Sequence, residues 1–449
     1  MFIMASDAAR IVGGSLFGED VEIDGVSFDS RLILAGQCFV ALEAERDGHM
    51  FVNDAYDAGA SACIVRRGAI SDDQVPPECA RIDVDDTMAA LTALGVWARE
   101  KLEHSASGKV IGVTGSAGKT STKDFIAAVL AATCDQSYAS ELSYNNDIGV
   151  PTTLFNAPDE CDAIVVEMGM RGFGEISRLC DIARPHVGVI TSIGEAHSER
   201  VGGIEGVARA KGELLLALPA HGTAIVCADD PRAMHAASLA TATRLTFGVA
   251  HDADVRYNVV STDQWGRANI IVQWGDRSRS VTIPVPGVHM ASNAVAAIAV
   301  GVAIGSDFDA CVDAIANAQL SYMRMQWETT DNGVRVMNDA YNANPDSMLA
   351  ALTTLSTVNA PQHVAVVGVM AEIADTRDRH AFIADQAREL GIELWPVGTD
   401  LYGVSPITVD EAATRISHLP TGSVVLLKGS RVAALERVLD FLSVAPPRQ

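Results

Sequence analysis

Short runs rich in β-branched residues alternate with helical patterns along almost the whole of this 449-residue chain. Such alternation is typical of parallel sheets covered by helices, because each pair of parallel strands needs a crossover between them. We therefore predict an α/β fold. Most strand candidates end in glycine or a polar residue, and ligands usually bind at that edge of an α/β sheet. The clearest candidates are residues 110–113, 163–167, 187–191, 223–227, 334–338, 364–368 and 424–427.

The chain is too long for one hydrophobic core, since a domain typically has about 100 to 200 residues. Two stretches resemble joints: the charged, poorly periodic segment 100–109, and residues 318–323, which follow an alanine-rich helical stretch. We predict three domains, with bounds 1–106, 107–319 and 320–449.

The net charge of −24 comes from 57 acidic and 33 basic residues, which argues against nucleic acid or anionic membranes as partners. Eight cysteines are scattered singly without a CxxC pair, which favours reduced thiols and a cytoplasmic protein. Residues 1–14 lack the pattern of a signal peptide, and the longest apolar helical stretch, 294–304, is shorter than the roughly 20 residues that a membrane span needs. We expect no membrane insertion.

A glycine loop lies between the strand candidate at 109–113 and a helical pattern whose apolar face includes Phe125 and Val129. Backbone amides of such a loop can surround phosphates, the lysine can reach the β- and γ-phosphates, and the following hydroxyl can ligate Mg²⁺. The spacing is a variant, because Val113 stands where the consensus has its first glycine and Gly112 lies one residue early. We predict ATP binding by Thr114, Gly115, Ser116, Ala117, Gly118, Lys119 and Thr120.

Two further polar residues follow strand candidates. Glu167 ends an apolar strand candidate, where a metal-binding carboxylate belongs. Taken alone, a solvated strand-end glutamate would fit equally well, but the glycine loop one unit earlier favours the metal ligand, since ATP chemistry needs Mg²⁺. His197 lies in a loop at the same sheet edge, and a lone loop histidine is usually a surface residue.

A lysine interrupts the apolar face of a helical pattern that begins near Ile204. Lys211 lies on the same face as Ile204 and Val207, where burial disfavours an ammonium group. It either extends along the helix to reach solvent or is kept partly neutral and reactive. The spacing alone favours the first interpretation.

Four motifs occur in the order found in the Mur ligase family. The chain resembles this family through Thr114-Gly-Ser-Ala-Gly-Lys-Thr120, Val166-Glu-Met-Gly169, Gly194-Glu-Ala-His197 and Ala210-Lys-Gly-Glu213. The segment Asn338-Asp-Ala-Tyr-Asn-Ala-Asn-Pro-Asp-Ser347 is similar to the member that adds D-alanyl-D-alanine, as are Phe28-Asp-Ser-Arg31, Asp47-Gly-His49 and Tyr144-Asn-Asn-Asp-Ile-Gly149.

The resemblance implies an N-terminal domain that binds a UDP-linked substrate, a central ATPase domain and a C-terminal Rossmann-like domain. It implies that Thr120, Glu167, His197 and Lys211 hold two Mg²⁺ ions, with Lys211 carbamylated by CO₂. Three departures from the family's pattern are Met290, Met323 and Ser143, where Asn, Gly and Asn are common. The implied nucleotide contacts are Asn293 to adenine, Arg324 to phosphate and Asp339 to ribose, and the implied substrate contacts are Ser30, Arg31, Asn145, Asn146 and Lys428.

The activity implied by the resemblance is ATP-dependent ligation of D-alanyl-D-alanine to UDP-N-acetylmuramoyl-tripeptide through an acyl phosphate, by a monomeric enzyme. Lys119, His197 and Lys211 are the implied catalytic residues. A related amide ligase, such as a folylpolyglutamate synthase or a lipid-linked muramoyl amidation subunit, is one alternative. A phosphate-loop regulatory or motor NTPase without any acceptor is another.

Overall fold

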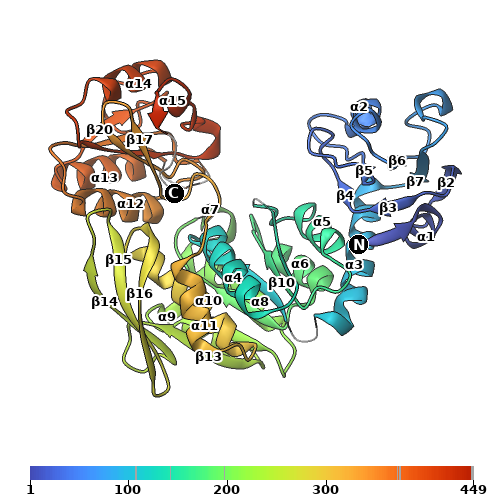
Figure 1. Ribbon diagram of the computed structural model, residues 1–449, viewed down its shortest axis with the longest axis horizontal. Helices are drawn as coiled ribbons and strands as arrows, with labels where there is room; N and C mark the ends of the chain where they lie inside the picture. Colours follow the sequence, from blue (N-terminus) through green and yellow to red (C-terminus); the bar gives the residue numbers. More distant parts are fainter. Residues whose placement is uncertain (107–108, 142, 197, 372, 374–375, 446–449) are drawn as a thin grey trace.

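The computed structural model describes residues 1–106, 109–141, 143–196, 198–371, 373 and 376–445. Three lobes follow one another along the chain, an N-terminal lobe drawn in blue, a central lobe in cyan to yellow, and a C-terminal lobe in orange to red (Figure 1). Parallel strands dominate the large sheet of each lobe, so the predicted α/β class is confirmed.

The N-terminal lobe is built on a five-stranded sheet in the order β2-β7-β6-β5-β4, and only the edge strand β2 is antiparallel to its neighbour. A separate pair, β1 and β3, is antiparallel. The strands are β1 (Phe2–Met4), β2 (Ser15–Gly18), β3 (Glu22–Asp24), β4 (Val26–Ser27), β5 (Cys38–Val40), β6 (Ala62–Arg66) and β7 (Ala80–Val84). The helices are α1 (Ala5–Ile11), η1 (Gly48–Phe51), α2 (Val52–Asp57) and η2 (Asp72–Gln74).

A long helix, α3 (Thr87–Ser105), connects the first lobe to the second. Asp86 begins it by accepting bonds from the amides of Met88 and Ala89. The helix packs on α5 and α6 of the central lobe. The stretch 100–109, expected as a poorly periodic joint, is therefore helical up to Ser105, because burial of Leu102 holds the last turns on the central lobe.

Arg99 joins α3 to the end of α6 by hydrogen bonds. Its side chain is only 1% exposed, and its guanidinium donates to the carbonyls of Ala183 (2.7 Å) and Arg184 (3.1 Å) at the end of α6. Those carbonyls have no partner within their own helix, since the last turn of an α-helix leaves them free. Arg99 thus closes α6 and joins α3 to it.

The central lobe contains a nine-stranded sheet in the order β16-β15-β14-β13-β12-β11-β8-β10-β9. The seven strands from β9 to β14 in this order pair in parallel, and β15 and β16 extend β14 into an antiparallel ribbon that the alternating pattern did not predict. The strands are β8 (Val110–Thr114), β9 (Ser137–Ala139), β10 (Ala163–Glu167), β11 (Val187–Ile190), β12 (Thr223–Cys227), β13 (Thr243–Gly248), β14 (Val255–Thr262), β15 (Arg267–Trp274) and β16 (Arg277–Pro286).

Both faces of the sheet are buried at its central parallel strands β8, β10 and β11, which explains their continuous apolar runs. On β8, Ile111 and Val113 pack with α4 and α10, while Val110 belongs to the core that α3, α5, α6 and α8 build on the other face. The helices are α4 (Lys119–Thr133), α5 (Gly149–Asn156), α6 (Glu175–Ala183), α7 (Ser198–Val201), α8 (Ile204–Leu216), α9 (Pro231–Ser238), α10 (His289–Ala303) and α11 (Phe308–Ala316).

The C-terminal lobe has a six-stranded sheet in the order β20-β19-β21-β18-β17-β22, with antiparallel pairing only at β17 and β22. The strands are β17 (Gln326–Thr330), β18 (Arg335–Asn338), β19 (His363–Val367), β20 (Glu393–Pro396), β21 (Val424–Lys428) and β22 (Val444–Ala445). The helices are α12 (Pro345–Thr357), α13 (Thr376–Glu389), α14 (Val409–Ser417), η3 (Arg431–Ala433) and α15 (Arg437–Asp440).

The turn between β14 and β15 touches the C-terminal lobe. Trp327 on β17 donates its indole N–H to the Trp265 carbonyl (2.9 Å), and the two rings meet edge to face. The Arg335 guanidinium lies over both rings, at 5.4 Å and 5.7 Å from their centroids. The ribbon therefore gives the C-terminal lobe a second attachment, separate from the chain segment that leads into it (Figure 1).

Neither disulfide bonds nor membrane-spanning helices are found in the part of the chain that the structure describes. All eight cysteines are free thiols and six of them are buried. Among the described residues, no helix has both the length and the apolar character that crossing a bilayer requires.

Arg99 gives a prediction about stability. Arg99→Met leaves the buried Ala183 carbonyl and the half-buried Arg184 carbonyl without this donor, so we expect the free energy of unfolding to fall by about 2 to 4 kcal/mol. Arg10→Met is the matched control, because the exposed Arg10–Asp7 pair on α1 should be worth less than about 0.5 kcal/mol. Urea denaturation followed by circular dichroism measures both, and equal losses in the two variants would contradict the role of Arg99.

Candidate active site

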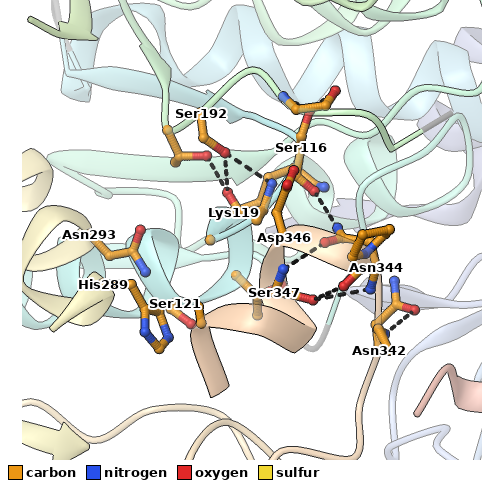
Figure 2. A pocket seen from close by; sticks show the side chains of 18 of the residues that line it. Ser116, Lys119, Ser121, Ser192, His289, Asn293, Asn342, Asn344, Asp346 and Ser347 are labelled. Atoms are coloured by element: carbon orange, nitrogen blue, oxygen red, sulfur yellow. Dashed lines mark hydrogen bonds between the residues drawn. The ribbon is translucent and has the colours of Figure 1, made fainter. Parts of the chain in front are cut away.

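A cleft of about 870 Å³ lies between the central and C-terminal lobes, at the carboxyl ends of the central strands (Figure 2). In Figure 2, Ser116, Lys119 and Ser192 lie on the central side, and Asn344, Asp346 and Ser347 face them from the start of α12. Predicted residues on its walls are Ser116, Ala117, Gly118, Lys119, Thr120, Asn145, Glu167, Asn293, Arg324, Asp339 and Lys428.

Close packing around two glycines shapes the loop between β8 and α4. Gly118 has φ of +79° and precedes α4, and a side chain there would also collide with Asn293. A side chain on Gly115 would overlap the Thr191 hydroxyl. Behind the loop, the Ser116 amide donates to the Ser192 carbonyl (2.9 Å) and the Ala117 amide to the Ser192 hydroxyl (3.1 Å). The loop after β11 thus supports the glycine loop.

Two lysines meet at one carbonyl oxygen. Lys119 Nζ and Lys211 Nζ each lie 2.9 Å from the Gly115 oxygen. Lys211 is 1% exposed, so the expectation that it extends to solvent is wrong; its helix is packed on the sheet and its amine ends beneath the loop. Burial, reinforced by the nearby Lys119 charge, holds the pKa of Lys211 well below its usual range, which favours a neutral amine.

An oxygen-rich corner adjoins the start of α4. The Thr120 hydroxyl donates to Glu167 Oε2 (2.8 Å), and Asn145 donates its side-chain amide to Glu167 Oε1 (2.7 Å). Glu167 is 1% exposed and its own amide donates to the Ser140 hydroxyl (3.1 Å). A carboxylate and a hydroxyl held this way are the hard oxygen ligands that Mg²⁺ prefers.

Arg324 enters this corner from the segment that links the lobes. Its guanidinium donates to the Thr120 hydroxyl (2.9 Å) and lies 4.2 Å from the centroid of the Tyr341 ring. Among the described residues its buried Nε has no acceptor. A buried donor without a partner is costly, and an incoming anion would satisfy it.

The C-terminal wall holds residues to which the sequence analysis gave no role, although Asn344 and Asp346 lie in the segment 338–347. Asn344 Nδ2 donates to the Ser116 carbonyl (3.3 Å), and Arg379 on α13 pairs with Glu195 of the central lobe (2.6 Å). Partial burial and the charge of Glu195 raise the pKa of Asp346. Asn344 is recognisable as a helix cap followed by Pro345, whereas Arg379 is the fourth residue of an ordinary polar helix and carries no local signal.

Asp339 and Lys428 lie together at the strand ends of the C-terminal lobe. Lys428 is 2% exposed, and its Nζ contacts Asp339 Oδ2 (2.5 Å) and the Asn342 carbonyl (3.0 Å). His289 lines the cleft nearby. Burial lowers the pKa of His289 to about 4; the Asp339 charge opposes this shift and the Lys428 charge adds to it. The imidazole is therefore neutral at pH 7.

Three predicted substrate residues lie away from this cleft. Ser30 and Arg31 belong to the N-terminal lobe, where Arg31 is exposed and paired with Asp29 (2.6 Å). Asn146 caps α5 by accepting from the amides of Ile148 and Gly149. A ring contact of 5.3 Å between Phe28 and Tyr144 brings the 28–31 loop beside the 144–146 segment. His197 lies outside the described residues.

The cleft thus combines a glycine loop, cationic side chains from both lobes and an oxygen-rich corner. Opposing charges of this kind suit a polyphosphate with its divalent cations.

Comparison with known proteins identifies the family to which the chain belongs. Residues 113–301 match the model of the Mur ligase middle domain, and residues 323–431 match that of the Mur ligase, glutamate ligase domain. The UDP-N-acetylmuramoyl-tripeptide–D-alanyl-D-alanine ligase of Bacillus subtilis is 34% identical over 98% of both chains.

Two solved structures are similar over most of their length. A crystal structure of MurF from Acinetobacter baumannii superposes with a TM-score of 0.83 at 29% identity, covering 98% of this chain and 99% of the other. The MurF ligase of Thermotoga maritima in complex with ADP gives 0.77 at 25% identity, covering 93% and 96%. This chain, with its glycine loop, buried lysine and bridging arginine, belongs to the Mur ligase family.

Proposed function

We propose that the chain is an ATP-dependent ligase that joins D-alanyl-D-alanine to UDP-N-acetylmuramoyl-tripeptide, a step of peptidoglycan precursor synthesis. The observation that carries this proposal is the cleft, in which the glycine loop with Lys119 faces Arg324 and the start of α12. The Bacillus subtilis D-alanyl-D-alanine ligase, which matches 98% of this chain, supports the choice of substrates.

Binding of ATP in this cleft follows from its cations. Lys119 and Arg324 would contact the phosphates, Asn293 the adenine and Asp339 the ribose. The Thermotoga maritima relative was solved in complex with ADP, which supports binding of an adenine nucleotide by this chain. Ser30, Arg31, Asn145 and Asn146 are the proposed contacts of the UDP-linked peptide, with Lys428 approaching the substrates from the C-terminal lobe.

Magnesium fits the corner made by Thr120 and Glu167, because both supply oxygen atoms that are already oriented by hydrogen bonds. Lys211 would add a further anionic ligand as a carbamate, and His197 is the remaining proposed ligand. When bound, the two Mg²⁺ ions would reduce the negative charge of the phosphates, whose approach to a carboxylate otherwise costs several kcal/mol.

The carbamate is supported by the state of Lys211. A neutral amine attacks CO₂ and an ammonium does not, and burial beside Lys119 favours the neutral amine. The new C–N bond gives a carbamate with the loss of one proton. The resulting negative charge would lie close to Lys119 and so replace a repulsion by an attraction.

The reaction has two chemical steps. The terminal carboxylate of the tripeptide attacks the γ-phosphorus, forming an acyl phosphate as the bond to ADP breaks. The amine of D-alanyl-D-alanine then attacks the acyl carbon, an amide forms, phosphate leaves, and a proton is released. Lys119 and Arg324 hold the transferred group throughout. The acyl phosphate is prone to hydrolysis, so the lobes must also exclude water.

Substrate omission tests this proposal directly. We expect ADP release to require both UDP-N-acetylmuramoyl-tripeptide and D-alanyl-D-alanine, and replacement of the dipeptide by glutamate or ammonia to abolish it. Glutamate-dependent or ammonia-dependent release would indicate a folylpolyglutamate-type or amidating ligase instead. Equal ADP release without any acceptor would indicate a phosphate-loop NTPase.

Lys211→Ala tests the carbamate. We expect turnover to fall by at least about 10³-fold, because a metal ligand is lost, and short carboxylic acids to restore part of it by filling the space. ¹³C-bicarbonate should give wild-type protein a carbamate resonance that the variant lacks. Lys101→Ala, an exposed lysine on α3, is the control and should change neither readout. Full activity of Lys211→Ala would exclude the carbamate.

We expect the C-terminal lobe to close on the central lobe when substrates bind. The cleft contacts come from both lobes, so entry of nucleotide requires the C-terminal lobe to move away and product formation requires its return. Small-angle scattering should therefore differ between the free enzyme and the enzyme with all substrates and a nonhydrolysable ATP analogue. Superimposable curves would count against rotation. A monomeric state and a cytoplasmic location stay predictions.

A further inference from the structure

The segment 320–326 between the lobes has an unusual backbone. Met323 and Met325 both have positive φ, +61° and +54°, in a region that residues other than glycine and asparagine avoid. Arg324 stands between them and donates to Thr120. Backbone strain of this kind persists only where surrounding contacts enforce it, and it concentrates at functional positions.

Packing holds each methionine in place. Met323 is 8% exposed and belongs to the core of the C-terminal lobe, together with Val334 and Val336. Met325 is fully buried in the core cluster that extends into the central lobe. The two side chains are therefore anchored in different cores, on either side of an arginine that points into the cleft.

Hydrogen bonds close the same segment on itself and fix its start to α4. Gln326 accepts from the Met323 amide (3.0 Å) and donates to the Leu320 carbonyl (3.2 Å). Ser321 donates both its amide (2.8 Å) and its hydroxyl (3.0 Å) to the Asp124 carboxylate. Asp124 lies one turn beyond Thr120 on α4, so the helix that carries Thr120 also sets where the segment begins.

We propose that the left-handed conformations of Met323 and Met325 are a positioning device that fixes the Arg324 guanidinium at Thr120 for contact with the nucleotide phosphates. Extended or helical backbone at either position would turn the Arg324 side chain away from Thr120, because the direction of a side chain follows from the backbone on both sides of it. The inference rests on the proposed ATP site.

Substitutions at position 323 separate backbone from side chain. Gly and Asn adopt positive φ readily and Val does not, although Val alone retains an apolar side chain. We expect ATP to bind Met323→Gly and Met323→Asn more tightly than Met323→Val by about tenfold, the effect of one charge-assisted hydrogen bond. The KM for ATP should rise in Met323→Val, while the KM for the UDP-linked peptide should not change.

A double substitution shows whether the effect passes through Arg324. In an Arg324→Ala background, the difference between Gly and Val at position 323 should disappear. Met337→Val, the same change at a fully buried methionine in the regular strand β18, is the control and should leave ATP affinity unchanged. A difference that persists without Arg324, or tighter binding by Met323→Val than by Met323→Gly, would overturn the inference.

Two further outcomes have defined meanings. If Met323→Val does not show a cooperative unfolding transition, the same comparison is made with Gly and Val at position 325. Loss of folding in both Val variants would show that the segment is required for folding, and would contradict the positioning role. If wild-type protein does not bind ATP in isothermal titration calorimetry, the proposed function itself fails, whatever the variants do.

Discussion

The carbonyl oxygen of Gly115 receives two lysine amines, and much of the cleft's chemistry depends on that shared contact. Two ammonium groups at one oxygen repel each other, and the repulsion grows where water is excluded. The fold relieves it by burying Lys211, which shifts that amine toward its neutral form and leaves Lys119 as the charged group at the loop. The two amines at this oxygen therefore differ in character, since burial favours the neutral form only for Lys211.

The opposite wall of the cleft completes a site that neither lobe contains alone. Arg324 reaches Thr120 from the connecting segment, Asn344 reaches the Ser116 carbonyl from the start of α12, and Arg379 pairs with Glu195. Each contact joins a residue of the glycine-loop region to one beyond position 320. These contacts run directly between the two sides of the cleft, so a change in the relative position of the lobes would alter the surroundings of the glycine loop.

Local sequence was enough to predict the parts of the site that depend on local structure. The glycine loop follows a strand and opens a helix, so its position at the sheet edge could be inferred from three adjacent segments. Lys211 was harder, because the same helical spacing permits both an exposed and a buried amine, and only the packing of α8 on the sheet decides between them. Arg379 gives no signal at all until α13 is placed beside the loop that contains Glu195. The antiparallel ribbon β14–β16 was missed for a related reason, since alternating strands and helices suggested crossovers throughout.

The ribbon has a mechanical consequence. The C-terminal lobe is attached to the central lobe at the connecting segment, and its Trp327 and Arg335 also hold the turn at Trp265. A rigid body attached to another at two separated points keeps a single free rotation, about the line through those points. A swing of the C-terminal lobe that preserved both attachments would therefore follow one arc, along which the start of α12 would move toward or away from the glycine loop.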